Sequence, residues 1–256
     1  MRIAFLGTPV DLLSAGETAG RALQAMRGGP PVTHVALNVA KFVKMRGDEE
    51  LRRDVEQADI IGIDGMGLVL ALRLFGQRRV ERVAGVDLMF ALLERCAELG
   101  LRPFLLGAKR DVLERAATVA RDRWPGLEFA GLHDGYFSPA EEQGVADQIR
   151  ASGADCLFVA MPTPRKERFL HQHGRGLQVP FIMGVGGSVD VLAGHVSRAP
   201  LPMQRLGLEW LHRLVQEPRK MFWRYASTNA VFAAIIARAC VARLFGRVAV
   251  RRLSHR

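Results

Sequence analysis

Residues 59–67 read DIIGIDGMG: a short apolar run, a single carboxylate, and then two glycines. The uncharged run at 60–63 is typical of a strand that is buried on both faces. Glycine-rich or polar stretches follow two other apolar runs in the same way, at 161–167 and 184–187. Because ligands of parallel α/β sheets bind outside the carboxyl ends of the strands, these three stretches are candidate site segments.

Apolar runs alternate with amphipathic segments over the first 200 residues. Ser14 with Glu17, and Ser138 with Glu141, match the capping box that begins a helix. The alternation predicts an α/β fold, a Rossmann-like and mainly parallel sheet flanked by helices. The expected strands are Arg2–Leu6, Thr33–Leu37, Asp59–Ile63, Pro103–Leu106, Glu128–Gly131, Cys156–Ala160 and Pro180–Gly184. The expected helices cover about 15–27, 48–57, 87–99, 109–123, 139–151 and 165–173.

Composition excludes several classes of protein. With 256 residues, 49% hydrophobic and 24% charged, the chain is neither a disordered polymer nor an ordinary polytopic membrane protein. Its three cysteines have no metal-ligand spacing, which argues against a disulfide scaffold or a zinc module and favours a reducing compartment. The first apolar run is too short for a signal peptide.

Charge divides the chain into two parts. The net charge is +10, but residues 201–256 hold eleven basic and two acidic residues, so the first 200 residues are nearly neutral. We therefore expect a catalytic domain over 1–200 and a basic helical appendage over 201–256. Such an asymmetry indicates an anionic partner, which could be a membrane surface, a nucleic acid or a phosphorylated ligand.

The appendage has the pattern of a helix that lies in a membrane interface. Its longest uncharged run, 225–237, has 13 residues, fewer than the roughly 20 that span a bilayer. Arg243, Arg247 and Arg251 recur every four residues and would share one helical face, with apolar residues largely off it. The alternative is a helix packed on the body with a solvated arginine face.

Several catalytic signatures are missing from the sequence. It has no P-loop, no complete GxGxxG after the first strand and no GxSxG elbow. An ordinary NTPase or dinucleotide-dependent oxidoreductase is therefore disfavoured. The DxD element with which many nucleotide-sugar enzymes hold a divalent metal is also missing.

Asp64 is the carboxylate in the most unusual setting. At a strand end, between glycines that permit close ligand approach, it suits a general base. It could equally be the N-cap of a helix that begins near Met66. Asn38 also ends an apolar run, and it could be a cap or a ligand contact.

Two groups of cations could meet phosphate. Lys166 lies in a loop stiffened by prolines and could face a phosphate near a helix start, or simply belong to a solvated turn. Arginines beside Trp210 and Trp223 could clamp a diphosphate at a membrane interface, or contact a nucleic-acid backbone. The basic residues of this second group are Arg213, Arg219, Lys220 and Arg224.

An ordered series of short motifs resembles the WecG/TagA/CpsF glycosyltransferase family. The series covers about residues 1–224, and its specificity lies in the order. The stretches are Leu37-Asn38, Asp64-Gly-Met-Gly67, Arg82-Val-Ala-Gly-Val-Asp87, Phe104-Leu-Leu-Gly107, Trp124-Pro125, Gly135-Tyr-Phe137, Pro164-Arg-Lys-Glu167, Gly184-Val-Gly-Gly187 with Asp190, Arg198-Ala-Pro200, and Gly207-Leu-Glu-Trp-Leu-His-Arg213 with Glu217-Pro218.

The resemblance implies an inverting, metal-independent and cofactor-free transferase. Such an enzyme moves a hexose, of glucose or N-acetylhexosamine type, from a UDP-sugar to a polyprenyl-diphosphate-linked saccharide in exopolysaccharide or other cell-surface synthesis. It implies a peripheral protein on the cytoplasmic face of a bacterial membrane, with an anionic membrane surface rather than nucleic acid as its partner. A homo-oligomer is a further expectation.

The resemblance assigns the family's functional roles to the residues at matching motif positions. Asp64 matches the proposed base, and the other matching positions form the substrate-binding set. That set is Asn38, Arg82, Gly107, Lys166, Gly186, Arg213, Arg219 and Arg224, the last three expected to meet the lipid diphosphate. Two departures are Ala36 for the usual Thr, and Lys166 for a neutral Gln, which favours a glucosyl donor.

Three alternatives compete with a transferase. The basic tail could serve a non-enzymatic module that binds membrane or nucleic acid. The α/β sheet could carry a nucleotide-dependent oxidoreductase, although the dinucleotide fingerprint is missing. The chain could also be a family member that binds UDP-sugar without turning it over.

Overall fold

The computed structural model describes residues 1–205, 207–216, 218–246 and 250–253. Side chains are described throughout these ranges except at 205, 219–221, 224 and 225.

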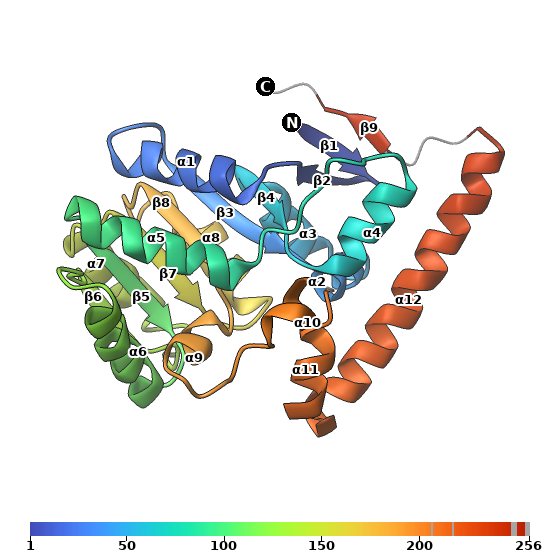
Figure 1. Cartoon of the computed structure of the whole chain (residues 1–256). Coiled ribbons are helices and arrows are strands. Elements are labelled where there is room, and N and C mark those ends of the chain that lie inside the picture. Colours follow the sequence, from blue (N-terminus) through green and yellow to red (C-terminus); the bar gives the residue numbers. More distant parts are fainter. Residues whose placement is uncertain (206, 217, 247–249, 254–256) are drawn as a thin grey trace.

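A six-stranded, all-parallel sheet forms the centre of the molecule (Figure 1). In spatial order the strands are β4 (Ile60–Ile63), β3 (Val32–Leu37), β8 (Phe181–Gly184), β7 (Cys156–Ala160), β5 (Pro103–Gly107) and β6 (Gly131–His133). Four of these strands, β4, β5, β7 and β8, are buried almost throughout because helices cover both faces, and this explains their continuous apolar sequences. The expected α/β, Rossmann-like fold is confirmed.

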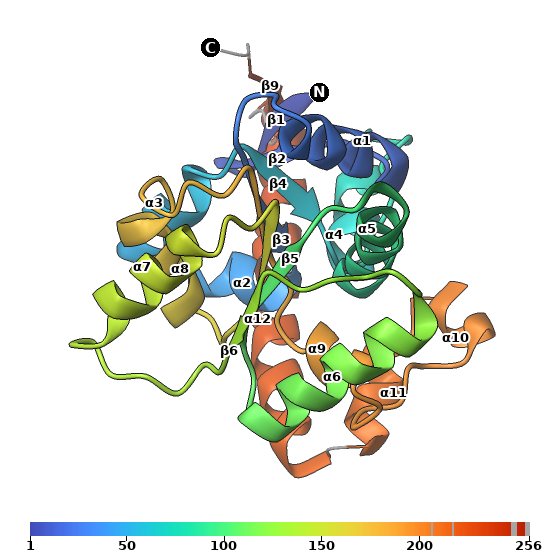
Figure 2. The same ribbon diagram turned by 90° about the vertical axis from the view of Figure 1, so that its left-hand side faces the viewer.

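Two helical layers enclose the sheet (Figure 2). One layer packs its apolar side chains on Leu105, Phe158 and Met183, and the other packs on Leu106, Val159 and Ile182. The first layer consists of α1 (Ala15–Met26), α5 (Gly85–Leu99), α6 (Arg110–Arg123) and α9 (Ser188–Leu192). The opposite face carries α2 (Val39–Lys44), α3 (Glu49–Glu56), α7 (Glu142–Ala151) and α8 (Arg165–His173), while α4 (Met66–Leu74) follows β4.

A second, antiparallel sheet joins the two ends of the chain. It consists of β1 (Arg2–Phe5) between β2 (Thr8–Asp11) and β9 (Val250–Arg252). Asp11 fixes it to the edge of the main sheet by accepting a 2.8 Å hydrogen bond from the Ile61 N–H and pairing with Arg2. The first predicted strand therefore exists, but it lies outside the parallel sheet.

Helix α12 (Pro218–Leu244) dominates the C-terminal region, after α10 (Leu201–Arg205) and α11 (Glu209–Gln216). At 1.5 Å per residue its 27 residues extend about 40 Å along the body. Phe232 is buried near its middle and meets the Phe42 ring edge-on at 5.7 Å. The appendage is thus packed against the domain rather than separate from it.

Several sequence predictions need correction at this level. The proposed helical face of Arg243, Arg247 and Arg251 is wrong, because α12 ends at Leu244 and Arg251 lies in β9 opposite Ala4. Arg247 lies outside the described residues. The Ser14 capping box is confirmed, with both hydrogen bonds present. Ser138 also binds Glu141, but α7 begins only at Glu142, so this pair closes a turn before the helix.

Candidate active site

Three adjacent strands end at the candidate site. Asn38 follows β3, Asp64 follows β4, and the turn 184–187 follows β8. Because β3 lies between the other two in a parallel sheet, these segments meet at one edge. Figure 1 places α9, α10 and α11 at the end of the molecule toward which the β5 and β7 arrows point.

Backbone hydrogen bonds fix the segment around Asp64 between the end of β3 and the loop that precedes α5. Its N–H donates to the Leu37 carbonyl at 2.8 Å, and the Val83 N–H donates to the Ile63 carbonyl at 2.9 Å. Gly65, not Asp64, is the N-cap of α4, and no side chain caps that helix. The N-cap interpretation of Asp64 is therefore wrong, and its carboxylate is available for another role.

The Asp64 carboxylate faces the start of α5. A Cβ placed on Gly85 would lie 3.6 Å from Asp64 Oδ2, and the Gly85 N–H is a hydrogen-bond donor to the carboxylate. Burial raises the pKa of Asp64 above its ordinary value of 3.8, and the charge of Glu209 adds to the increase. Arg82, the Gly85 N–H and Arg213 act in the opposite direction. A carboxylate with a raised pKa in a partly open position has the character of a general base.

Arg82 is mostly buried beside this carboxylate and pairs with the appendage. Its Nη2 lies 2.7 Å from Glu209 Oε2, and its side chain is 13% exposed. Glu209 also faces Arg198, whose guanidinium forms a two-point pair with Asp87. These contacts connect α11 and the preceding loop to α5, the helix that carries Gly85.

Asn38 caps α2. Its Oδ1 accepts a 2.9 Å hydrogen bond from the Lys41 N–H, so the cap interpretation is confirmed. A Cβ on Gly65 would lie 3.5 Å from Asn38 Cβ, which places this asparagine next to the Asp64 loop. Asn38 Nδ2 points to no hydrogen-bond partner in the described ranges, and a ligand contact through that atom stays a prediction.

Arg213 reaches the turn after β8. A Cβ on Gly187 would lie 3.5 Å from Arg213 Nη2 and 3.7 Å from Asp190 Oδ2. Gly186 precedes it with a φ of +52°, which turns the chain toward α9. A guanidinium, a carboxylate and a glycine turn therefore converge at the end of β8.

Lys166 lies in a buried ion cluster. Glu167 Oε1 is 3.4 Å from Lys166 Nζ, 2.9 Å from Lys41 Nζ and 3.1 Å from Thr163 Oγ1. The solvated-turn interpretation is therefore wrong, since Lys166 is only 6% exposed and lies against Gly184. Burial and the Lys41 charge lower the pKa of Lys166 to about 8. Burial alone would raise the pKa of Glu167, but the two ammonium groups outweigh it and lower that pKa to about 2.

The remaining predicted residues lie farther away or outside the description. Gly107 ends β5, four strands from β4, which corresponds to about 19 Å across the sheet. A Cβ there would lie 2.6 Å from the Ala160 backbone, so close packing of β5 on β7 accounts for this glycine. Arg219 and Arg224 fall in α12, and their side chains lie outside the part of the chain that the structure describes.

Sequence reasoning missed Glu209 and Arg198 as partners at the site. Arg82 and Glu209 are 127 residues apart, and only the fold brings them together. The only sequence feature that could have indicated their role is that both lie in stretches that resemble the family's motifs. Within the described ranges, no group of three or more His, Cys, Asp or Glu side chains is arranged to hold a metal ion.

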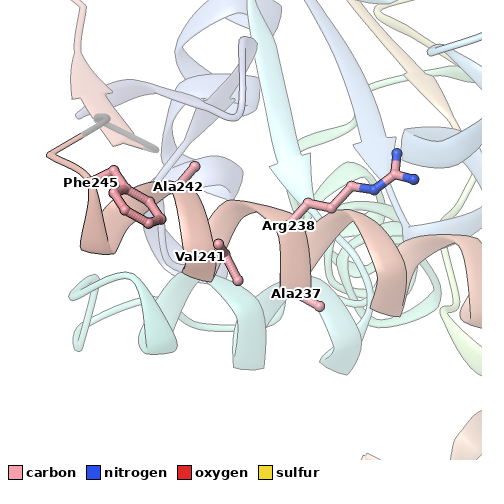
Figure 3. A pocket seen from close by; sticks show the side chains of 5 residues that line it. All are labelled: Ala237, Arg238, Val241, Ala242 and Phe245. Carbon is pink, nitrogen blue, oxygen red and sulfur yellow. The ribbon is translucent and has the colours of Figure 1, made fainter.

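A shallow hollow of about 540 Å³ lies elsewhere, on α12 (Figure 3). It is lined by Ala237, Arg238, Val241, Ala242 and Phe245, none of which belongs to the predicted site. Residues 226–244 are long and apolar enough to cross a membrane, although the uncharged run had predicted a segment too short to do so. Both ends of α12 are nevertheless tied to the body, through α11 and through the pairing of β9 with β1.

Comparison with known protein families gives one match over nearly the whole chain. The model of the glycosyl transferase WecG/TagA/CpsF family matches residues 3–245, which include every segment that forms the site and most of the appendage. The chain therefore belongs to the WecG/TagA/CpsF family and is a glycosyltransferase of cell-surface polysaccharide biosynthesis, acting on a sugar donor and a lipid-linked acceptor.

Proposed function

We propose that this protein transfers a hexosyl residue, with inversion, from a UDP-sugar to a saccharide carried on polyprenyl diphosphate. The observation that carries the proposal is the Asp64 carboxylate, partly buried at the end of β4, with a raised pKa and with Arg82 and Arg213 as its cationic neighbours. A base and phosphate-binding cations at one sheet edge are what such a reaction requires.

In this mechanism Asp64 accepts the proton of the acceptor hydroxyl. The hydroxyl oxygen forms a bond to the anomeric carbon on the face opposite UDP, and the bond from that carbon to the phosphate oxygen breaks. UDP leaves with the electron pair. The transition state has oxocarbenium character, as in glycoside hydrolysis, and it needs a base within hydrogen-bond reach of the attacking hydroxyl.

Negative charge grows on the departing phosphate. Arg213 and the backbone N–H groups at 186–187 are the groups that we place against it, because Arg213 lies beside Gly187. Lys166 is already paired with Glu167, so we assign it to the support of the β8 end rather than to direct phosphate contact. The reaction needs no metal ion in this scheme.

Exposed apolar and basic side chains on the appendage support a site at a membrane surface. Large apolar side chains are exposed at the end of α12, among them Val241, Leu244 and the following Phe245, with Arg238 and Arg243 on the same helix. Because α12 is packed on α2 through Phe232, we propose that it lies along the cytoplasmic surface of the bacterial membrane instead of spanning it.

A donor panel tests this function. The purified full chain is incubated with a polyprenyl-diphosphate monosaccharide and UDP-glucose, UDP-N-acetylglucosamine or UDP-N-acetylmannosamine, with and without EDTA. We expect one donor to increase the mass of the lipid product by one hexosyl unit, equally well in EDTA. No product with any donor would contradict the proposal, and product formed only without EDTA would contradict its metal independence.

A further inference from the structure

Glu209 places a carboxylate on Arg82, one of the two cationic neighbours of the candidate base. It comes from the first turn of α11 and contacts Arg82 at 2.7 Å. Its other oxygen lies 3.6 Å from Arg198 Nε, too far for a hydrogen bond. That Nε is buried and has no hydrogen-bond partner among the described atoms. Both terminal nitrogens of Arg198 are paired with Asp87, so Arg82 and the Arg198 Nε that lacks a partner in the described ranges together form an anion site that Glu209 fills incompletely.

The same helix presents the opposite charge one turn later. Glu209 and Arg213 are four residues apart and therefore share a face of α11. Both act on Asp64, since Glu209 raises its pKa and Arg213 lowers it. Helix α11 consequently brings both a competitor and a ligand for a phosphate to the candidate site.

Helix α11 also begins close to the Asp64 loop. Gly207 precedes it with a φ of +73°, and a Cβ there would lie 2.6 Å from Met66 Cγ. Met66 is two residues from Asp64. The Glu209 end of α11 is therefore packed against the start of α4, just after Asp64, and its position is fixed by packing as well as by charge.

We propose that Glu209 is a place-holding carboxylate, which occupies the Arg82–Arg198 anion site until a substrate phosphate displaces it. The inference rests on the proposed function, because it takes the displacing group to be a phosphate of the substrates. When the phosphate enters, Arg82 exchanges the carboxylate for it, and Arg213 on the same helix gains a partner. Glu209 thereby neutralises Arg82 while no phosphate is bound, as Asp87 neutralises Arg198, and it weakens phosphate binding by competition.

Calorimetric titration of the full chain with inorganic pyrophosphate, at low ionic strength and without any sugar, tests this competition. Glu209→Gln removes the competing charge and keeps the shape, so pyrophosphate should bind roughly three- to tenfold more tightly. Arg82→Gln should weaken binding. The matched control is Glu98→Gln, which removes a carboxylate from a surface pair with Arg95 and should leave the affinity unchanged.

A double-mutant cycle separates competition from a general change in charge. In the Arg82→Gln background, Glu209→Gln should improve the affinity much less than it does alone. Equal improvement in both backgrounds, unchanged or weaker binding by Glu209→Gln, or no pyrophosphate binding by any form would overturn the inference. Glu209→Ala provides the same test if the Gln variant does not fold by circular dichroism.

The outcome is independent of the transfer assay. If the double-mutant cycle shows competition for pyrophosphate but the protein transfers no sugar, the place-holding role of Glu209 is supported and the proposed function is contradicted. If the protein transfers sugar but the cycle shows no coupling between Arg82 and Glu209, the proposed function is supported and the role of Glu209 is contradicted.

Discussion

At the scale of single residues, the site depends on what surrounds one carboxylate. Asp64 does not cap a helix. Its carboxylate accepts a hydrogen bond from the Gly85 N–H, and the charges of Arg82, Arg213 and Glu209 act on it. The sequence alone left Asp64 as either a general base or a helix N-cap, because the residue that caps α4 depends on the backbone conformation at Gly65. The sequence identified Asn38 as a polar residue at the end of a strand. The hydrogen bond that its side chain accepts from the Lys41 N–H shows that it caps α2.

The pH dependence of transfer follows from the raised pKa of Asp64. A general base works only when deprotonated, so kcat/KM should fall as the pH falls through a value above 3.8. Glu209→Gln removes a charge that raises this pKa, and its acid limb should move to lower pH. Glu98→Gln should leave the limb in place. An acid limb that Glu209→Gln does not move would contradict the electrostatic coupling of these residues.

At the scale of elements, the buried cluster of Lys41, Lys166 and Glu167 joins α2 to α8 beneath the end of β8. The apolar strand sequences made most of the parallel sheet predictable, since β4, β5, β7 and β8 are continuous apolar runs that are buried almost throughout. The predicted strand at 128–131 was misplaced, because β6 begins at Gly131 and its three residues are only half-buried. The cluster was not predictable, because Lys41 and Glu167 are brought together only by the crossover of chain segments more than 100 residues apart.

Glu167→Gln should destabilise the fold by about 3 kcal/mol, because it leaves two buried ammonium groups without their counter-charge. Urea unfolding at pH 7 measures the loss. Glu50→Gln, which removes an exposed partner of Arg168, should cost no more than about 0.5 kcal/mol. The folded pKa of Glu167, about 2, lies below its ordinary 4.5. Its stabilisation is therefore present above pH 4.5 and lost as the pH falls toward 2, and the variant should lack this acid-dependent part. Equal costs for the two variants would refute the structural role of the cluster.

Phe232→Ala tests how α12 is attached. The ring is buried against Phe42, and its truncation should cost about 3 kcal/mol. Phe222→Ala on the same helix is the control, because that ring is 53% exposed and should matter little for stability. Thermal unfolding that is the same for both variants would show that α12 is not part of the folded body.

At the scale of the whole molecule, both termini meet in one small sheet and the appendage is continuous with the core. Charge counting predicted a basic C-terminal region, but it could not predict the end of α12 or the strand β9. Pairing of Val250 with Phe5 is a contact between the two ends of the chain, which no local pattern reveals. Removing residues 201–256 would therefore uncover the core as well as the proposed membrane surface.

Membrane attachment is better tested with point variants. Leu244 and Phe245 are 84% and 79% exposed, and changing both to Gln preserves the charge. Sedimentation with vesicles rich in phosphatidylglycerol should show roughly tenfold weaker binding or more. Tyr136→Gln, at an exposed position far along the chain from α12, should bind like the parent. Added salt should weaken binding of all three proteins. Full binding by the double variant would show that this end of α12 does not contact the membrane.

The central claim is that Asp64 is the base of a metal-independent hexosyl transfer. Its most direct test is single-turnover transfer by Asp64→Asn in EDTA, with the parent chain beside it and folding checked by circular dichroism. The account predicts a folded variant whose rate is lower by about a hundredfold or more. A folded variant that transfers sugar at nearly the parent rate would contradict it.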